Sequence, residues 1–196
     1  MKDWTGNNRT TFTILGASNH SDYERAEHDF YATDCRAIDE LYKVIGVPKN
    51  VWECACGAGH LSKRMEQLGS KVISTDLIDR GYGEGGIDFL NESKLKAPVI
   101  ITNPPYRHAK EFVLHSIELG AETVCMFLRI TFLEGINRQE LFQKYPPHTV
   151  AVFVRRIQVA RNGDPEMFQK NSAACYAWFI WQKGYTGKPE IIWINK

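Results

Sequence analysis

The chain has 196 residues, 43% of them hydrophobic and 24% charged, and a net charge of +1. This length suits one domain with a full hydrophobic core, and the near-neutral charge excludes a protein that binds nucleic acid through an overall positive field. No apolar run reaches membrane-spanning length, no secretion signal is visible, and the five cysteines form no CxxC pair, so we expect a cytoplasmic protein with neither disulfides nor a metal site.

Residues 1–21 are polar and lack periodicity, which predicts an N-terminal arm, and we expect residues 22–196 to form a single domain. Over residues 34–44 the apolar side chains recur at helical spacing, and "GVPKN" ends that helix. Strands and helices then alternate, which is typical of a parallel sheet covered on both faces. The strands are predicted at 51–55, 71–76, 98–103 and 123–129, and the helices at about 60–68 and 111–120.

The C-terminal part of the chain follows another pattern. "TVAVFVRR", "ACYAWFIWQK" and "EIIWINK" succeed one another without a convincing helix between them, which favours antiparallel strands at one edge. The predicted fold class is therefore α/β, a doubly wound and mostly parallel sheet with antiparallel C-terminal edge strands. Ligands bind such sheets beyond the carboxyl ends of the strands, which here are residues 53–59, Asp76 and Asn103.

A glycine turn follows the first of these strands. Gly57 and Gly59 in "ECACGAGHLS" allow a tight turn whose backbone can approach a ligand closely. Ser62 stands where a dinucleotide fingerprint has its third glycine. The carboxylate of Glu53 is a poor neighbour for a pyrophosphate and suits a cationic ligand. The alternative is a purely structural strand–helix corner.

Two further carboxylates follow predicted strands. Asp76 is placed to accept both hydroxyl protons of a ribose, although a lone aspartate there is more often a helix cap or a turn residue. Asp88 and Phe89, in "GIDFLN", could hold an adenine by its amino group and its face.

The stretch "VIITNPPY" ends a buried strand on an asparagine. Because neither Pro104 nor Pro105 has an N–H, the corner offers acceptors, namely the side-chain oxygen of Asn103 and the carbonyl of Pro104. Tyr106 adds a stacking face. Such an array suits a planar group with an NH₂, whose nitrogen becomes a better nucleophile when its hydrogens are accepted. A structural Pro-Pro loop explains the prolines but not the whole array.

Together, "NPPY" at 103–106 and "ECACGAG" at 53–59 resemble the motif pair of S-adenosylmethionine-dependent amino-methyltransferases. Their order is similar to the γ arrangement of DNA N6-adenine methyltransferases. "DFYATD" (29–34) resembles that family's N-terminal cofactor motif, with a departure at "DC". "FLEGINR" (132–138) and "YAWFIWQKG" (176–184) resemble phage or prophage members. The resemblance implies a seven-stranded, Rossmann-like class I methyltransferase fold.

The resemblance also implies roles for individual residues. The target amine would be bound by Asn103, Pro104, Pro105 and Tyr106. The cofactor, S-adenosylmethionine, would be bound by Tyr31, Thr33, Glu53, Gly57, Gly59, His60, Asp76, Asp88 and Phe89. DNA is the expected partner, and the base would be flipped into the site.

Candidate DNA-facing segments are residues 129–147 and 155–171. Their basic side chains would contact phosphates, which gives affinity without sequence reading. These are Arg129, Arg138, Arg155, Arg156, Arg161 and Lys170. Since neither segment is long enough for a target-recognition domain, we expect a short or relaxed sequence preference, or a partner that supplies it. The oligomeric state is left open.

Two alternatives keep the cofactor and change the substrate to an RNA base or a protein glutamine amide. Protein-glutamine methyltransferases usually carry a helical N-terminal domain for which this chain has no room. A third alternative is a catalytically dead methyltransferase fold that binds nucleic acid. The presence of Glu53, Asp76 and Asn103 together argues against it, because a dead site does not need them.

Overall fold

The computed structural model describes residues 30–161 and 174–195, so the expected arm at residues 1–21 lies outside the described residues. The helices are α2 (Arg36–Ile45), α3 (His60–Gln67), α4 (Ala109–Glu118) and α5 (Gln139–Lys144), and the short 3₁₀ turns are η2 (Phe89–Asn91), η3 (Tyr106–His108), η4 (Ile130–Leu133) and η5 (Ile136–Arg138). The strands are β1 (Tyr31–Thr33), β2 (Asn50–Glu53), β3 (Lys71–Ser74), β4 (Val99–Thr102), β5 (Thr123–Arg129), β6 (Thr149–Phe153), β7 (Val159–Arg161), β8 (Tyr176–Gln182) and β9 (Glu190–Ile194).

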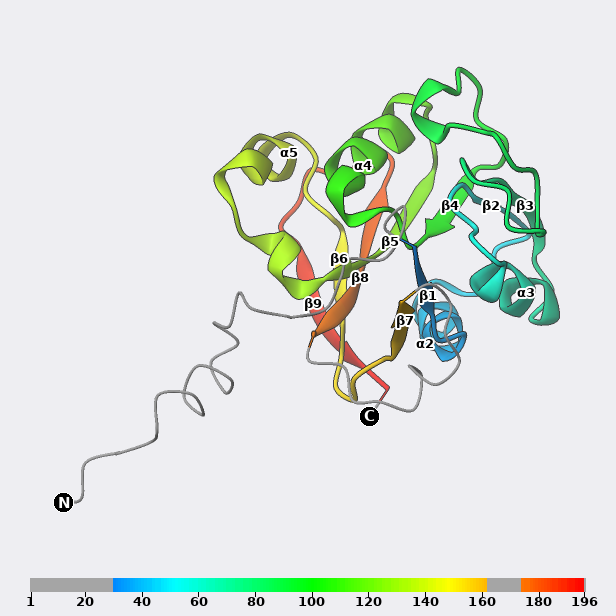
Figure 1. The fold of residues 1–196 in the computed structure, drawn as a ribbon. Helices are drawn as coiled ribbons and strands as arrows, with labels where there is room; N and C mark the ends of the chain where they lie inside the picture. Colours follow the sequence, from blue (N-terminus) through cyan, green and yellow to red (C-terminus); the bar gives the residue numbers. More distant parts are fainter. Residues whose placement is uncertain (1–29, 162–173, 196) are drawn as a thin grey trace, which may run out of the picture.

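Seven strands form one twisted sheet in the order β3-β2-β4-β5-β8-β6-β9 (Figure 1). The pairs β2–β3, β2–β4 and β4–β5 are parallel, as the alternation of strands and helices predicts. The three C-terminal strands complete one side of the sheet. β8 runs antiparallel to both β5 and β6, while β9 runs parallel to β6. The predicted fold class is confirmed.

Helices cover both faces of the sheet. α2 and α3 pack on one face, where Leu41 and Met65 meet Ile101 of β4. α4 packs on the other face, where Phe112 belongs to the same core cluster as Ile100 of β4. Consecutive side chains of a strand point to opposite faces, so the pair Ile100 and Ile101 anchors both layers. Figure 1 shows the two helix layers on either side of the sheet.

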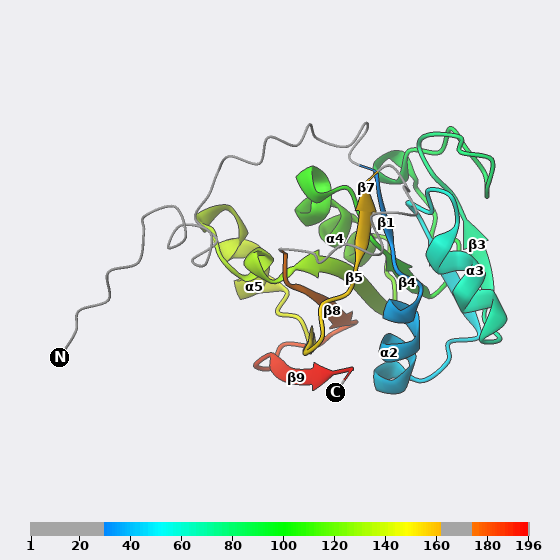
Figure 2. The same ribbon diagram turned by 60° about the horizontal axis from the view of Figure 1, so that its bottom comes forward.

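A two-stranded ribbon lies apart from this sheet. β1 pairs with β7 in antiparallel register, with Tyr31 opposite Arg161 and Thr33 opposite Val159. The two strands lie side by side in Figure 2. β1 directly precedes α2, so the ribbon carries residues 31–33 to the carboxyl ends of β2 and β4. Strands of three residues are too short for a periodic signal, and the sequence did not predict them.

Candidate functional site

A cavity of about 690 Å³ opens at the carboxyl ends of β2, β3 and β4. Its volume lies within the usual range for small-molecule sites. The residues that flank the glycine turn and the Asn103 corner both border this one cavity. Predicted site residues that line it are Tyr31, Thr33, Glu53, His60, Asp76, Asp88, Phe89, Asn103 and Pro105. Gly57, Gly59, Pro104 and Tyr106 are not among the lining residues.

The glycine turn is closely covered by aromatic rings. Gly57 and Gly59 have φ angles of +54° and +78°, in the left-handed region that favours glycine. A Cβ at Gly57 would come within 2.4 Å of the Phe30 ring, and one at Gly59 within 2.3 Å of the Tyr82 ring. Both glycines are therefore required by the backbone and by the rings packed on them. No sequence pattern indicated the contact with Tyr82.

Asp76 fixes the glycine turn from the end of β3. Its Oδ2 accepts a hydrogen bond from the Gly57 N–H at 2.7 Å. Its Oδ1 accepts from the Ile78 N–H at 2.9 Å and pairs with Arg80 Nη1 at 3.1 Å. The Arg80 guanidinium also lies 4.5 Å from the Phe30 ring centroid. A ribose bound here has to share or displace these partners. Sequence reasoning missed Arg80.

Glu53 is a buried carboxyl at the end of β2. It accepts a hydrogen bond from the Ser62 hydroxyl, which lies 2.7 Å from the Ser74 hydroxyl. Burial raises the pKa of Glu53 to about 8, and the charges of Asp76 and Glu66 act in the same direction, while the bond from Ser62 opposes them. A nearby cation would favour the ionised form instead.

This raised pKa makes the stability of the protein depend on pH. The folded protein holds the Glu53 proton more tightly than the unfolded chain does. The contribution of this proton to the free energy of unfolding is therefore complete below about pH 4.5 and is lost as the pH rises towards 8. We expect the free energy of unfolding of wild type to fall over this window relative to Glu53→Gln. Denaturant titrations from pH 5 to 8 measure it.

Glu122→Gln is the matched control, since Glu122 is exposed. Its unfolding profile should run parallel to that of wild type. If Glu53→Gln also runs parallel to wild type, the carboxyl does not titrate as described.

Asn103 is held in one orientation by β1. Its Nδ2 donates hydrogen bonds to the Tyr31 carbonyl and to Thr33 Oγ1, both at 2.9 Å. Because a backbone carbonyl only accepts, this fixes which end of the amide faces β1. The Asn103 Oδ1 is buried and has no hydrogen-bond partner. Such an atom costs free energy, so it is an acceptor that lacks its donor.

Tyr106 lies within a group of aromatic rings. Its ring centroid is 5.5 Å from that of Tyr31 and 6.3 Å from that of Tyr176, which in turn stacks on Phe127 at 4.9 Å. The Arg129 guanidinium lies 5.4 Å from the centre of the Tyr106 ring. Burial raises the pKa of the Tyr106 hydroxyl. The predicted stacking face of Tyr106 is therefore packed by protein rings.

The remaining cofactor candidates also have structural partners. Asp88 caps η2 by accepting from the Leu90 N–H at 3.0 Å. Phe89 is buried against Trp52 and Phe112, with ring centroids at 5.1 and 4.8 Å. Burial and the charge of Lys63 lower the pKa of His60. All three predicted residues still border the cavity.

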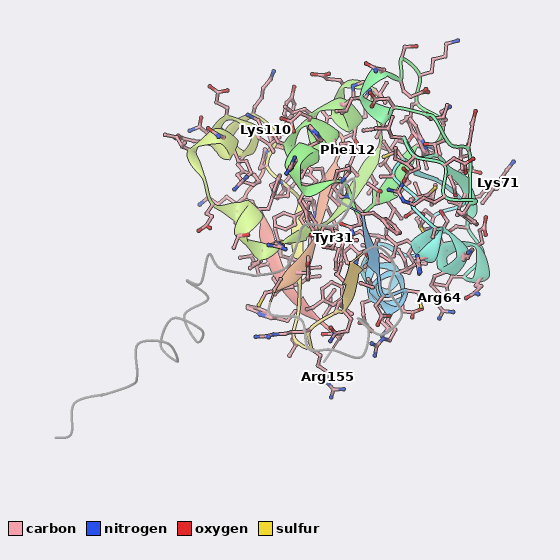
Figure 3. The ribbon with its side chains drawn as sticks, in the orientation of Figure 1. Tyr31, Arg64, Lys71, Lys110, Phe112 and Arg155 are labelled. Atoms are coloured by element: carbon pink, nitrogen blue, oxygen red, sulfur yellow. The ribbon has the colours of Figure 1, made fainter. Side chains whose placement is uncertain are left out.

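The predicted DNA-contacting residues are dispersed. Arg129 lies at the Tyr106 corner, whereas Arg138 donates to the carbonyls of Thr131 and Glu134 in its own loop. Arg155 and Arg156 are exposed, and Figure 3 shows Arg155 at the lower edge of the view, away from Tyr31. The Arg161 side chain and Lys170 lie outside the described residues.

The described part of the chain holds no group of His, Cys, Asp and Glu side chains placed to bind a metal ion. Over residues 30–161 and 174–195, none of the helices has the length and apolar character needed to cross a bilayer.

No protein-family model and no curated protein matches this sequence. Among solved structures, a dimethyladenosine transferase from Plasmodium falciparum is 16% identical with a TM-score of 0.52, over 74% of this chain and 59% of that one. A protein described as the modification subunit of a type I restriction enzyme from Vibrio vulnificus is 13% identical with a TM-score of 0.53, over 92% and 49%.

The 1,6-didemethyltoxoflavin-N1-methyltransferase from Burkholderia thailandensis, solved with S-adenosylhomocysteine, is 11% identical with a TM-score of 0.52, over 89% of this chain and 85% of that one. The chain thus spans about half to three fifths of the first two proteins and most of the third. Their names describe different substrates, so the likeness concerns the fold and not the substrate. The chain has the Rossmann-like class I methyltransferase fold.

Proposed function

We propose that this protein transfers a methyl group from S-adenosylmethionine to an exocyclic amine, with adenine N6 in DNA as the target. The observation that carries the proposal is the buried, unpartnered Oδ1 of Asn103, a residue that borders the same cavity as Glu53 and Asp76. An acceptor without a donor beside a site for a cationic nucleoside fits a reaction between an amine and a sulfonium. Motif order and the fold support the same reaction.

The residues around the cavity fit this cofactor. Asp76 would bind the ribose hydroxyls, and Glu53 would face the cationic methionyl end, where a positive charge favours its ionised form. Asp88 and Phe89 would border the adenine. S-adenosylmethionine supplies an electrophilic methyl group on a positively charged sulfur.

The protein's own contribution is to hold the amine and stabilise the charge it acquires. Asn103 Oδ1 accepts one hydrogen of the target NH₂, and the Pro104 carbonyl accepts the other. The Asn103 amide is held by its hydrogen bonds to β1 before the substrate arrives, so its oxygen would stabilise the developing positive charge with little reorganisation. The nitrogen gains the methyl group as the carbon–sulfur bond breaks, and the extra proton leaves to solvent. An amide oxygen is too weak a base to take this proton, so no general base is assigned.

DNA is the preferred substrate for two reasons. The order of the glycine turn and NPPY resembles that of DNA adenine methyltransferases, and Arg129, a candidate phosphate contact, lies beside Tyr106. Neither basic segment is long enough to form a recognition domain, so we propose a short sequence preference or a partner that supplies it.

The test offers labelled S-adenosylmethionine and the full chain to unmethylated plasmid DNA, total RNA and a protein extract. We expect labelled N6-methyladenine in DNA, and at least about a hundredfold less with Asn103→Ala. Label confined to RNA bases or to glutamine would reassign the substrate. If calorimetry shows cofactor binding but no label enters any pool, the chain is a binding protein and the proposal fails.

A further inference from the structure

We propose that Tyr31 is a substrate-stacking residue, and that the target base is clamped between the rings of Tyr31 and Tyr106. The inference rests on the proposed function and deepens it, because the resemblance assigns Tyr31 to the cofactor. It rests on how the two rings and the cavity are arranged in the described residues.

The two tyrosines differ in their relation to the cavity. Tyr31 borders the cavity together with Asn103 and Pro105, whereas Tyr106 is not among the lining residues. The two rings are in contact, with centroids 5.5 Å apart and planes inclined at 32°. A planar substrate that enters the cavity towards Asn103 therefore meets Tyr31, which lines the cavity, before Tyr106, which does not. To stack on Tyr106 it has to move the Tyr31 ring aside.

A base can be inserted between the two rings after a small increase in the distance between them. A base inserted between two rings contacts each of them at van der Waals distance, so the two tyrosine rings must lie about 7–8 Å apart. From 5.5 Å the gap has to widen by about 2 Å. Tyr106 cannot easily supply this movement, because it packs against Tyr176 and Arg129. Tyr31 is half-buried and comes from the ribbon outside the main sheet, which makes it the movable side.

The movement leaves the acceptor in place. Asn103 is held by the backbone carbonyl of Tyr31 and by the side chain of Thr33. Rotation about χ1 of Tyr31 swings its ring and does not displace that carbonyl. β1 thus holds the Asn103 amide through the Tyr31 carbonyl and the Thr33 hydroxyl, and it contacts the base through the Tyr31 ring. Figure 3 shows Tyr31 near the centre of the view, below Phe112 of α4.

The experiment measures base stacking and cofactor binding separately. The probe is a pool of short single-stranded oligonucleotides with 2-aminopurine between random flanks, whose fluorescence is quenched on stacking. It is titrated with wild-type protein saturated with S-adenosylhomocysteine. The variants are Tyr31→Phe, which keeps the ring, Tyr31→Leu, which keeps apolar bulk without a π face, and Tyr31→Ala. Tyr185→Ala is the control, because its ring packs on His148 and it does not border the cavity.

We expect quenching by wild type and by Tyr31→Phe. Affinity for the probe should fall by about fivefold to a hundredfold in Tyr31→Ala and Tyr31→Leu, the range found for base–aromatic stacking. Affinity for S-adenosylmethionine, measured by calorimetry, should stay within about twofold of wild type in all variants. The leucine variant guards against a folding defect of the alanine variant, and thermal melts check both.

The outcomes separate the clamp from the proposed function. The clamp is overturned if wild type does not quench the probe, if Tyr31→Leu and Tyr31→Ala quench as well as wild type, or if they lose cofactor affinity and keep quenching. Ring-dependent quenching by a wild type that methylates no substrate would keep the clamp and remove the proposed function. Methylation that is unchanged in Tyr31→Ala would keep the function and remove the clamp.

Discussion

Asn103→Ala is expected to reduce methyl transfer about 10²–10³-fold, the cost of removing one preorganised polar group from a site where charge develops. The variant removes the buried Oδ1 that lacks a partner in the free protein. Binding of S-adenosylmethionine should survive, because Asn103 contacts β1 and not the glycine turn. Single-turnover rates with labelled cofactor measure the first effect, and calorimetry measures the second.

Asn103→Asp and Asn50→Ala complete this experiment. Asn103→Asp keeps an oxygen in place of Oδ1 and loses the two hydrogen bonds donated to β1, so it should lose less activity than the alanine variant. Asn50 is exposed at the opposite end of β2, and its alanine variant should behave like wild type. Full turnover by Asn103→Ala would show that the amide oxygen is not the acceptor.

Asp76→Ala is expected to weaken S-adenosylmethionine binding at least tenfold and to lower the free energy of unfolding by about 3 kcal/mol. The loss of stability has a separate cause from the loss of binding. Without the carboxylate, the Gly57 N–H has lost its acceptor and Arg80 has lost its counter-charge. Calorimetry and denaturant titration give the two quantities.

Two further variants separate the roles of this carboxylate. Asp79→Ala changes an exposed aspartate that caps the Gly81 N–H, and it should leave cofactor affinity unchanged. Arg80→Ala removes the cation that competes with a ribose for Asp76, so affinity should stay level or rise. A loss with Arg80→Ala as large as that with Asp76→Ala would make Arg80 itself a ligand, and would contradict its assignment as a competitor.

The sequence predicted those elements of the fold that have a local pattern of apolar residues. Continuous apolar runs located β2, β4 and β5, and residues at the carboxyl ends of β2 and β4 border the cavity. The insertion of β8 between β5 and β6 depends on pairing across the sheet, which no local pattern encodes. The ribbon was missed because three residues cannot establish a period.

Side-chain partners were the least predictable part of the site. The position of Asn103 at a strand end indicated an acceptor, but its orientation depends on Tyr31 and Thr33, which lie 72 and 70 residues away. Asp76 was expected to be open to a ribose, and its pair with Arg80 could not be read from a loop without periodicity. Arg138 matched a phosphate contact by charge alone, whereas its guanidinium binds carbonyls of its own loop.

The pairing of β1 with β7 has a consequence for biosynthesis. Tyr31 is synthesised well before its partner Arg161, which follows β6, and closing so long a loop is slow. The strands that carry Glu53, Asp76 and Asn103 are complete well before then. A nascent chain that ends ahead of Val159 would therefore lack the partner strand of β1, and its Asn103 amide would not yet be held by Tyr31 and Thr33. The acceptor would be oriented only after β7 has been synthesised.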